Sequence, residues 1–411
     1  MPNAYIVECC RTAGGKKNGR LSKWHPISLG AAVLDEVVAR SGIDASQIDD
    51  VIVGCVSQTG GQAGNIARNM VLASQHIPET VPGTSVDRQC GSSQQAIHFA
   101  AQAVMSGVQD VVIAAGVEHM SSVPIGSNIA DAFKAGHGLP IDDNINAKYG
   151  KRLEARGQRM FSQFEGAEIL AEKYNISREE MDQFAVASHA KALMATKNGY
   201  FKKEIVPLQG MDKKGNVVTH DTDEGIRPGT NMKALSGLKS LKELNSRGKQ
   251  KGIITAGLSS QICDGAAALL ICNEEGLRKL GVRPRARIVS LALAGDDPVM
   301  MLGGPIPATQ SALSKAGLRM SDMDIYEVNE AFCSVPLAWA KALGADLKKL
   351  NVNGGAMALG HPLGGTGAKL MTTLVHEMER RGSRYGVQAI CEGGGTANAT
   401  IIERMSVSAK L

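Results

Sequence analysis

Cys90 is the first residue whose type and position could do covalent chemistry. It stands just before residues 91–105, a stretch whose apolar residues recur at helical spacing. The unpaired backbone N–H groups and the dipole at a helix N-terminus stabilise negative charge, so a cysteine at this place can ionise and act as a nucleophile. A cysteine that opens a helix is also a common small buried side chain. Cys90 therefore needs companion residues before it predicts catalysis.

Two glycine-rich segments supply such companions. His361 lies in the stretch 353–367, between a glycine and a proline that favour a rigid turn, and could act as the base for a nucleophile from another part of the chain. Cys391 is followed by three glycines at 393–395, whose backbone N–H groups could form an oxyanion hole. A structural histidine and a plain hairpin turn are the alternative interpretations.

The elements that must position these residues are repeated along the chain. Residues 42–53 parallel residues 317–328, and each copy follows a helical pattern and ends in a β-rich run. Copies this far apart do not form a solenoid, so they predict two homologous α/β domains. A buried strand is expected at 110–117, and two further strands near the C-terminus at 387–390 and 399–402.

A long stretch between the two copies has a different character. From residue 121 to about 251, amphipathic helical patterns (165–174 and 178–195) alternate with loops rich in Gly, Asp and Lys. We expect this stretch to be an insertion over the first domain. Between residues 197 and 251 there are 12 Lys or Arg against 6 Asp or Glu. This surplus could face a phosphorylated ligand or form a solvated surface.

Composition excludes several classes of protein. A chain of 411 residues with 43% hydrophobic and 21% charged residues is too apolar for wholesale disorder and long enough for about two to three domains. Aromatic residues make up 4%, which argues against nucleic-acid binding by stacking. The eight cysteines show no CxxC pair and no short Cys/His spacing, so we expect neither a metal site nor a disulfide framework. No apolar run approaches the roughly 18 residues of a membrane span, and we expect a soluble intracellular protein.

Four motifs together resemble those of the thiolase family, the acyl-CoA C-acyltransferases, in order and approximate spacing over essentially the whole chain. They are Cys90-Gly91-Ser92, Asn329-Glu330-Ala331-Phe332, Gly360-His361-Pro362-Leu363-Gly364 and Cys391-x-Gly393-Gly394-Gly395. The resemblance implies reversible CoA-dependent thiolytic cleavage of 3-ketoacyl-CoA, or condensation with acetyl-CoA, in two acyl transfers. Coenzyme A would be a substrate, and neither a cofactor nor a metal is implied.

The resemblance also implies an architecture. The expected fold is a duplicated αβαβα fold of five layers with an inserted loop domain. The first domain would comprise residues 1–122 and 262–284, the loop domain 123–261 over the CoA site, and the second domain 285–411. Members of the family work as dimers or tetramers, so a homo-oligomer is implied.

Roles carried over from the family fall on residues that match its motifs. Cys90 would accept the acyl group, His361 would activate it, and Cys391 would move protons as an acid and base. Asn329 would hold a water with His361 as one oxyanion hole, and the N–H groups of Cys90 and Gly393 would form the other. The residues that would contact CoA or the acyl substrate are Arg227, Ala256, Gly257, Ser260, Ala331 and Phe332.

The chain departs from the family pattern beside these motifs. Ser93 stands where many members have Gly, and Thr396-Ala397-Asn398 follows the three glycines. Both changes are similar to members that act on longer or bulkier acyl chains. The motif at Asn329 argues against the sterol-carrier type, which carries a histidine there.

Two other functions remain as alternatives. A decarboxylating β-ketoacyl synthase has a related fold, although a second cysteine before a glycine turn favours a thiolase. A catalytically dead protein that binds lipid or CoA would not need Cys90, His361 and Cys391 together. The ending Ala409-Lys410-Leu411 resembles a peroxisomal address, so we expect a peroxisomal protein in a eukaryote and a cytoplasmic one otherwise.

Overall fold

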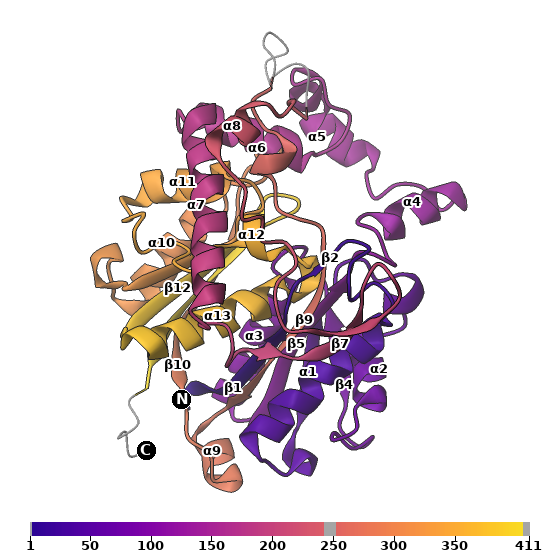
Figure 1. Cartoon of the computed structure of the whole chain (residues 1–411), viewed down its shortest axis with the longest axis vertical. Helices are drawn as coiled ribbons and strands as arrows, with labels where there is room; N and C mark the ends of the chain where they lie inside the picture. The colour runs from indigo at the N-terminus through magenta and orange to yellow at the C-terminus, as the bar shows by residue number, and fades with distance from the viewer. Residues whose placement is uncertain (1, 242–251, 406–411) are drawn as a thin grey trace.

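The computed structural model describes residues 2–241 and 252–405 (Figure 1). An eleven-stranded sheet contains a path of nine strands in the order β11-β12-β13-β10-β1-β9-β5-β3-β4, with β2 (Gly15–Lys16) paired to β9 and β6 (Ile205–Val206) to β1. Two further strands, β7 (Leu208–Met211) and β8 (Val217–His220), form a separate hairpin. The nine strands are β1 (Ala4–Thr12), β3 (Asp50–Gly54), β4 (Gly83–Val86), β5 (Val111–His119), β9 (Cys263–Cys272), β10 (Ala286–Gly295), β11 (Ile325–Val328), β12 (Tyr385–Glu392) and β13 (Thr396–Arg404).

The two halves of this sheet repeat one strand pattern. In the N-terminal half β3 runs parallel to β5, β5 antiparallel to β9, and β9 antiparallel to β1. In the C-terminal half β11, β12, β13 and β10 follow the same succession of directions. Only three residue pairs, between β1 and β10, join the halves. The duplication predicted from the sequence is therefore confirmed.

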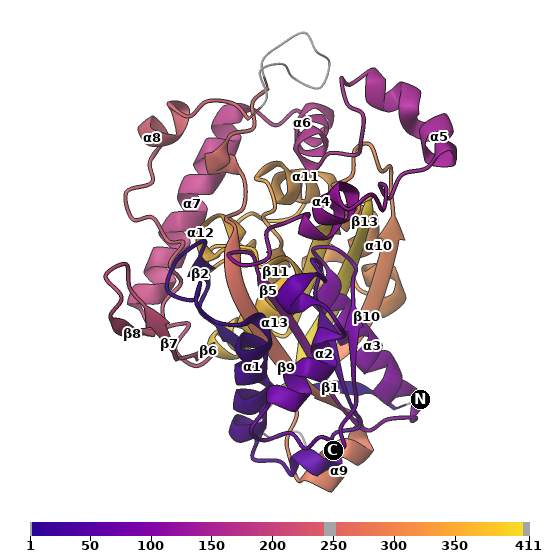
Figure 2. The ribbon, with the colours of Figure 1, turned by 90° about the vertical axis from the view of Figure 1, so that its right-hand side faces the viewer.

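The helices complete five layers. At the centre, α3 (Ser92–Ser106) and α13 (Thr366–Arg381) pack together between the half-sheets, where Ile97 and Ala100 share a core with Met371 and Leu374. The outer face of one half is covered by α1 (Pro26–Ser41) and α2 (Ile66–Ala73), and that of the other by α10 (Pro305–Ala316) and α11 (Ser334–Leu343). Figure 2 shows α1 and α10 on opposite sides, with α13 between them. This arrangement is the expected αβαβα fold.

Equivalent helices in the two halves use the same start and stop signals. Both α1 and α10 carry proline in the first turn, where its missing N–H has no helical partner to lose. Both end before a glycine, Gly42 and Gly317, that adopts φ +65°, a conformation glycine reaches without strain. The repeat seen in the sequence is thus a repeat of helix boundaries.

The stretch between the copies covers both halves. It holds α4 (Ser127–Lys134), α5 (Asp143–Glu154), α6 (Gln163–Lys173), α7 (Arg178–Lys197) and α8 (Met232–Ser236). Buried residues of α5, α6 and α7, such as Leu170 and Met181, join the core of the C-terminal half, whereas Val206 and Leu208 join that of the N-terminal half. The sequence predicted an insertion over the first domain, whereas the stretch packs on both halves, with α6 against α11 of the C-terminal half.

Two expectations remain untested by this fold. The tripeptide Ala409-Lys410-Leu411 lies outside the described residues, so its role as an address stays a prediction. The domain boundaries likewise stay predictions. Across residues 2–241 and 252–405, no helix combines the length and apolarity that crossing a membrane requires.

Candidate active site

Cys90 occupies a strained turn between β4 and α3. The preceding residue, Gln89, adopts φ +47°, which a non-glycine residue rarely does. The Cys90 side chain is partly exposed and packs against Val56, Met120 and Leu363. The turn therefore presents the thiol at the surface of a small apolar cluster, directly before the first turn of α3, as predicted.

The electrostatic environment of Cys90 differs from the expectation of a stabilised thiolate. Burial raises the pKa of the Cys90 thiol well above its ordinary value, and the neighbouring Cys391 and Glu392 raise it further. The sequence pattern revealed the favourable helix terminus but not these neighbours. In the resting protein Cys90 is thus a neutral thiol that needs a base.

His361 is held as such a base by bonds to both ring nitrogens. It follows Gly360, which adopts φ +81°, and its Nδ1 lies 2.6 Å from Thr366 Oγ1. The Thr366 hydroxyl donates to the Pro362 carbonyl at 3.0 Å, so its oxygen accepts a hydrogen bond from the Nδ1–H group. Nε2 consequently carries a lone pair and lies 3.3 Å from Asn329 Nδ2. We assign this tautomer from the hydrogen-bond network.

The charge state of His361 suits the same role. Burial lowers the pKa of His361 to about 3, and the nearby Lys369 ammonium contributes. Lys369 is 4% exposed and donates to the carbonyls of Leu359 and Gly360, the latter at 3.2 Å. It thereby anchors the two residues before His361 from the first turn of α13. The imidazole is neutral at physiological pH and available to accept a proton.

Asn329 begins the loop that follows β11 and is buried beside His361. Its Nδ2 faces the imidazole, while its Oδ1 has no hydrogen-bond partner among the described residues. A buried amide oxygen without a partner is costly, which favours a bound water or a ligand donor at this point. The structure therefore brings Asn329 and His361 together, as the predicted oxyanion site requires.

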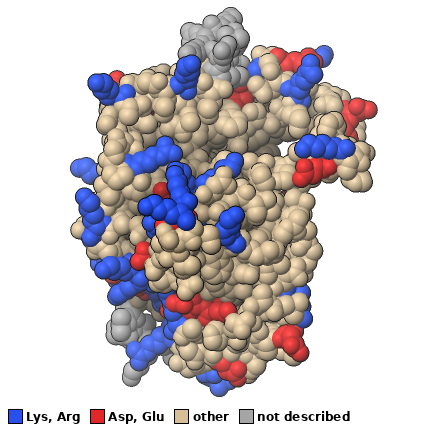
Figure 3. All heavy atoms as spheres, turned by 45° about the vertical axis from the view of Figure 1, so that its right-hand side comes forward, with Lys and Arg blue, Asp and Glu red and all other residues tan. Residues whose placement is uncertain are grey.

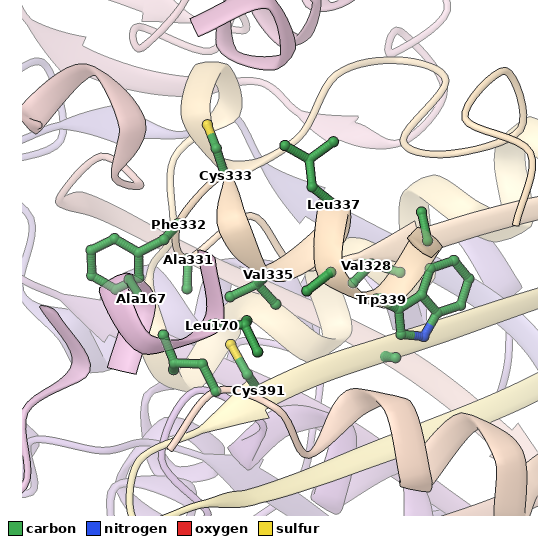
Figure 4. Close-up of a cluster of buried hydrophobic side chains, with 14 of the residues drawn as sticks. Ala167, Leu170, Val328, Ala331, Phe332, Cys333, Val335, Leu337, Trp339 and Cys391 are labelled. Carbon is green, nitrogen blue, oxygen red and sulfur yellow. The ribbon is translucent and has the colours of Figure 1, made fainter. Parts of the chain in front are cut away.

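Cys391 and Gly393 approach Cys90 from the C-terminal half. Cys391 lies in β12, and Figure 4 shows it among the side chains of Leu170 and Val335. Burial raises the pKa of Cys391 to about 12, so it is a neutral thiol and potential proton donor. A Cβ placed on Gly393 would meet Gln89 Oε1 at 3.0 Å, so the glycine turn lies against the Cys90 turn. The turn starts at Gly393 rather than at Cys391, as the sequence had suggested, because β12 continues through Glu392.

The segment around Ser260 forms one wall of an apolar pocket. Ser260 N–H donates to the Ala331 carbonyl at 2.9 Å, and Ser259 forms a β-bridge with Phe332. A pocket of about 180 Å³ opens here, lined on one side by this pairing and on the other by His361 and Leu363. Phe164 of α6 stacks edge-on against Phe332, with 5.5 Å between ring centroids. Three predicted substrate residues, Ser260, Ala331 and Phe332, therefore share a pocket with the predicted base.

Of the remaining predicted CoA residues, Ala256 and Gly257 precede the segment that lines this pocket, whereas Arg227 lies elsewhere. Ala256 and Gly257 belong to a single helical turn that ends just before Ser259, and a Cβ placed on Gly257 would meet the side chains of Leu235 and Leu238 at 2.7 Å. Arg227 is exposed and lines a separate pocket of about 290 Å³ with His189. It is not in contact with the His361 pocket.

One residue connects the two pockets. Gln261 Nε2 donates to the carbonyls of Gly225 at 2.7 Å and Met357 at 2.6 Å, and its own carbonyl accepts the His361 N–H at 3.0 Å. Met357 belongs to the short helix α12 (Ala356–Leu359). The loop that carries Arg227 is thus fastened to the His361 turn through Gln261.

The Lys and Arg side chains of residues 197–241 are exposed. Two acidic residues of this stretch, Glu204 and Asp223, are buried around Arg11, at 2.6 Å and 2.9 Å. Their charges are therefore neutralised inside the molecule, and the surface of this stretch is more positive than its residue count. Figure 3 shows Lys and Arg gathered on the middle of one face with few carboxylates among them.

Sequence reasoning missed the residues that hold the site together. Thr366, Lys369 and Gln261 position His361, and the Glu118 carboxylate accepts the N–H groups of Val56 and Gly364, tying the Cys90 cluster to the His361 turn. These are polar residues inside otherwise apolar or glycine-rich stretches. A polar residue inside such a stretch is a sign of a specific hydrogen bond, but the sequence does not show which group it binds.

The departure at Ser93 has a structural explanation. Ser93 is buried, and its hydroxyl accepts the Ala368 N–H at 2.9 Å. It thus fastens α3 to α13 in the central layer.

One group of side chains in the described ranges has the geometry of a cation site. Ligand atoms of Glu8, Cys9 and His376 lie within 4.8 Å of one another. Arg285 contacts both Glu8 and Cys9, and burial raises the pKa of Cys9 to about 12. Because His376 Nδ1 also lies 2.8 Å from the Thr372 carbonyl, the donors fit an ion pair better than a metal ion.

Comparisons with known proteins agree with this arrangement. The description "Thiolase, N-terminal domain" matches residues 4–275 and "Thiolase, C-terminal domain" matches residues 282–404. The chain is 48% identical over 405 residues to the steroid 3-ketoacyl-CoA thiolase FadA6 of Mycobacterium tuberculosis, covering 98% of this chain and 95% of that protein. It is 42% identical over 410 residues to a 3-ketoacyl-CoA thiolase of Klebsiella pneumoniae, covering 98% and 100%.

Solved structures give the same result. Human mitochondrial 3-ketoacyl-CoA thiolase superposes with a TM-score of 0.85 at 35% identity, covering 98% of this chain and 99% of that one. The acetyl-CoA acetyltransferase of Bacillus anthracis gives 0.86 at 38% identity, with the same coverage. With matching domains, fold and active-site motifs, the chain belongs to the thiolase family of acyltransferases, and thiolytic cleavage with its reverse condensation is its activity.

Proposed function

We propose that this enzyme cleaves 3-ketoacyl-CoA with coenzyme A by a ping-pong mechanism through an acyl group on Cys90. The observation that carries the proposal is the state of His361. Its Nδ1 is bonded to Thr366, its Nε2 is unprotonated, and it lines the pocket that Ser260 and Phe332 share. His361 is a neutral base that lines an apolar pocket, and Cys90 is a neutral thiol that packs against Leu363 of the same pocket. We infer that His361 takes the Cys90 proton when a substrate is bound.

The first half-reaction transfers the acyl group to Cys90. His361 takes the thiol proton, and Cys90 Sγ attacks the C3 carbonyl of the substrate. The C2–C3 bond then breaks, and Cys391 gives its proton to C2 of the departing acetyl-CoA. Because burial keeps Cys391 protonated, with a pKa of about 12, the proton is available when the carbanion forms.

The second half-reaction regenerates the enzyme. Cys391, now a thiolate, takes the proton of an incoming CoA thiol, whose sulfur attacks the acyl-Cys90 thioester. The new acyl-CoA leaves, and the Cys90 sulfur recovers its proton from His361. Protons and sulfurs therefore balance over the cycle, and no redox partner or metal is needed.

Two sets of donors would stabilise the oxyanions. A water held by Asn329 and His361 would serve one transition state, in keeping with the unpartnered Asn329 Oδ1. The backbone N–H groups of Cys90 and Gly393 would serve the other, in keeping with the contact between the two turns. Each such donor can lower a barrier by roughly 3–4 kcal/mol.

Coenzyme A would lie along the surface between the Arg227 loop and the His361 turn, which Gln261 holds together. Arg227 would contact a charged part of CoA, while Ala256, Gly257 and Ser260 would border the pantetheine chain that leads to the pocket of Ala331 and Phe332. The exposed position of Arg227 and its separation from the acyl pocket are both compatible with a long, charged cofactor-like substrate.

We also propose the boundaries 1–122 with 262–284, 123–261 and 285–411 for the three domains, and a homodimer or homotetramer. Sheet topology supports the division between the two halves. The edge strand β4 supports association, because it ends the strand path and pairs with a neighbouring strand on one side, β3.

Initial-rate kinetics test the mechanism. Acetoacetyl-CoA and CoA are varied together, and parallel double-reciprocal lines are expected because each substrate reacts with a different form of Cys90. Converging lines would contradict the acyl-enzyme. Incubation with malonyl-CoA serves as the control for a decarboxylating synthase, and no release of carbon dioxide is expected.

A further inference from the structure

Glu392 is a buried carboxyl that the mechanism above does not use. It is the last residue of β12, directly after Cys391, and its exposed fraction is 0%. Its Oε2 accepts the Thr396 hydroxyl at 2.7 Å. Its Oε1 has no hydrogen-bond partner in the part of the chain that the structure describes. Such a group requires an explanation, because an unpaired buried carboxylate is strongly unfavourable.

The free oxygen of Glu392 lies against the residue that follows Cys90. A Cβ placed on Gly91 would lie 2.0 Å from Glu392 Oε1 and 2.7 Å from Asn398 Nδ2. The Asn398 amide also donates to the Gly91 carbonyl at 3.0 Å. In this arrangement the Glu392 carboxyl occupies the space that a side chain at Gly91 would need. The departure residues Thr396 and Asn398 hold this arrangement together.

We propose that Glu392 is a positioning residue for both thiols: its carboxyl lies against Gly91, next to Cys90, and its protonation state sets how readily Cys90 and Cys391 ionise. The inference rests on the roles proposed for the two cysteines. It assigns Glu392 no contact with substrate.

The charges around Glu392 make it sensitive near neutral pH. Arg88 and Asp87 face it from the segment before Cys90, and the two thiols face it from the active site. Burial raises the pKa of Glu392 to about 7, Asp87 raises it further, and Thr396 and Arg88 oppose the rise. An ionised Glu392 in turn raises the pKa of both cysteines.

The direction of the effect follows from these signs. Below about pH 7 the Glu392 carboxyl is protonated, and it does not oppose a thiolate. Above that pH it is negative and opposes ionisation of Cys90 and Cys391. Glu392→Gln keeps the shape and can accept the Thr396 hydrogen bond, but it cannot become negative. Above about pH 7, the thiols of the Glu392→Gln variant should therefore ionise more readily than those of the natural enzyme. At lower pH the two enzymes should behave alike.

The experiment measures alkylation of Cys90 by iodoacetamide in the full chain, with peptide mass spectrometry, between pH 6 and pH 8.5. The ratio of the Glu392→Gln rate to the natural rate should be near 1 at pH 6. It should rise to about tenfold at pH 8.5, the effect of one charge a short distance from a thiol. Glu403→Gln is the matched control: Glu403 lies at the other end of the same hairpin, paired with Arg287, and its ratio should stay near 1.

A ratio for Glu392→Gln that is constant over this pH range would overturn the proposal, because a purely structural change alters all pH values alike. If that variant does not fold, Thr396→Val provides the second test. Losing its hydrogen bond lets Glu392 keep a proton to higher pH, so the rate ratio should exceed 1 near neutral pH and return to 1 at higher pH. Its absence would also overturn the proposal. Alkylation needs no substrate, so either result is independent of whether Cys90 carries an acyl group.

Discussion

Replacing Thr366 by valine should impair catalysis without removing any group that touches substrate. The Thr366 hydroxyl oxygen accepts a hydrogen bond from the His361 Nδ1–H group at 2.6 Å. It thereby selects the tautomer whose Nε2 carries no proton. Valine has nearly the same shape but cannot accept that proton. The imidazole must then keep an unsatisfied buried N–H or take the other tautomer, which cannot accept a proton at Nε2.

The size of the effect follows from the buried N–H. An unsatisfied donor costs about 1–3 kcal/mol, which corresponds to a roughly 5- to 150-fold lower kcat if the penalty falls on the catalytic tautomer. KM should change little, because Thr366 is not expected to contact CoA. Thermal stability should also fall, since the Pro362 carbonyl loses one of its two donors and keeps only the Gly365 N–H at 2.8 Å.

Steady-state thiolysis and thermal unfolding measure the two effects separately. Thr372→Val is the matched control: Thr372 is buried in the same helix, and within the part of the chain that the structure describes its hydroxyl bonds only the Ala368 carbonyl, at 2.8 Å. The Thr372→Val variant should lose stability but keep kcat. Thr366→Ser, which keeps a hydroxyl beside His361, should be more active than Thr366→Val. A folded Thr366→Val enzyme with kcat within twofold of the natural one would refute this account of His361.

Three further outcomes are expected. Arg227→Ala should raise KM for CoA substrates severalfold with a modest change in kcat, because it removes binding common to ground and transition states; an unchanged KM in thiolysis assays would remove Arg227 from the CoA site. Phe164→Ala should widen the acyl pocket and shift the ratio of kcat/KM toward longer 3-ketoacyl chains in a chain-length series, and an unaltered preference would place the acyl chain elsewhere. Stability should fall as pH drops from about 6.5 toward 3, because burial lowers the pKa of His98 and His376 to about 3 and the unfolded chain binds more protons in that range. Urea unfolding midpoints that are flat between these pH values would contradict the last expectation.

Local patterns predicted the scaffold well where both ends of an element were marked. The helical patterns that precede the two copies, at residues 29–40 and 308–316, correspond to α1 and α10, and the structure starts each helix three residues earlier, at a proline. The motif cysteines and His361 could be found for the same reason, since glycines and proline surround them. Physical chemistry makes such positions visible in a single sequence.

The electrostatics of the site could not be predicted in this way. The pKa of Cys90 depends on Cys391 and Glu392, which lie some 300 residues away in the chain and reach it only through the packing of two half-sheets. The helix N-terminus at Ser92 had predicted a lowered pKa for Cys90, whereas the folded surroundings raise it. The packing of α6 and α7 on the C-terminal half was missed for a related reason, because an amphipathic face shows that a helix is covered but not by which partner.

Mapping the acyl group tests the central claim most directly. The enzyme and its Cys90→Ser and Cys391→Ala variants are mixed with acetoacetyl-CoA, quenched with acid and digested, and the acetyl group is located by mass spectrometry. We predict acetyl on Cys90 in the natural enzyme, none that is stable in Cys90→Ser, and acetyl on Cys90 in Cys391→Ala, whose condensation rate should be roughly 10²–10⁴-fold lower. An acetyl group on Cys391 in the natural enzyme, or near-normal condensation by Cys391→Ala, would contradict the division of roles between the two thiols.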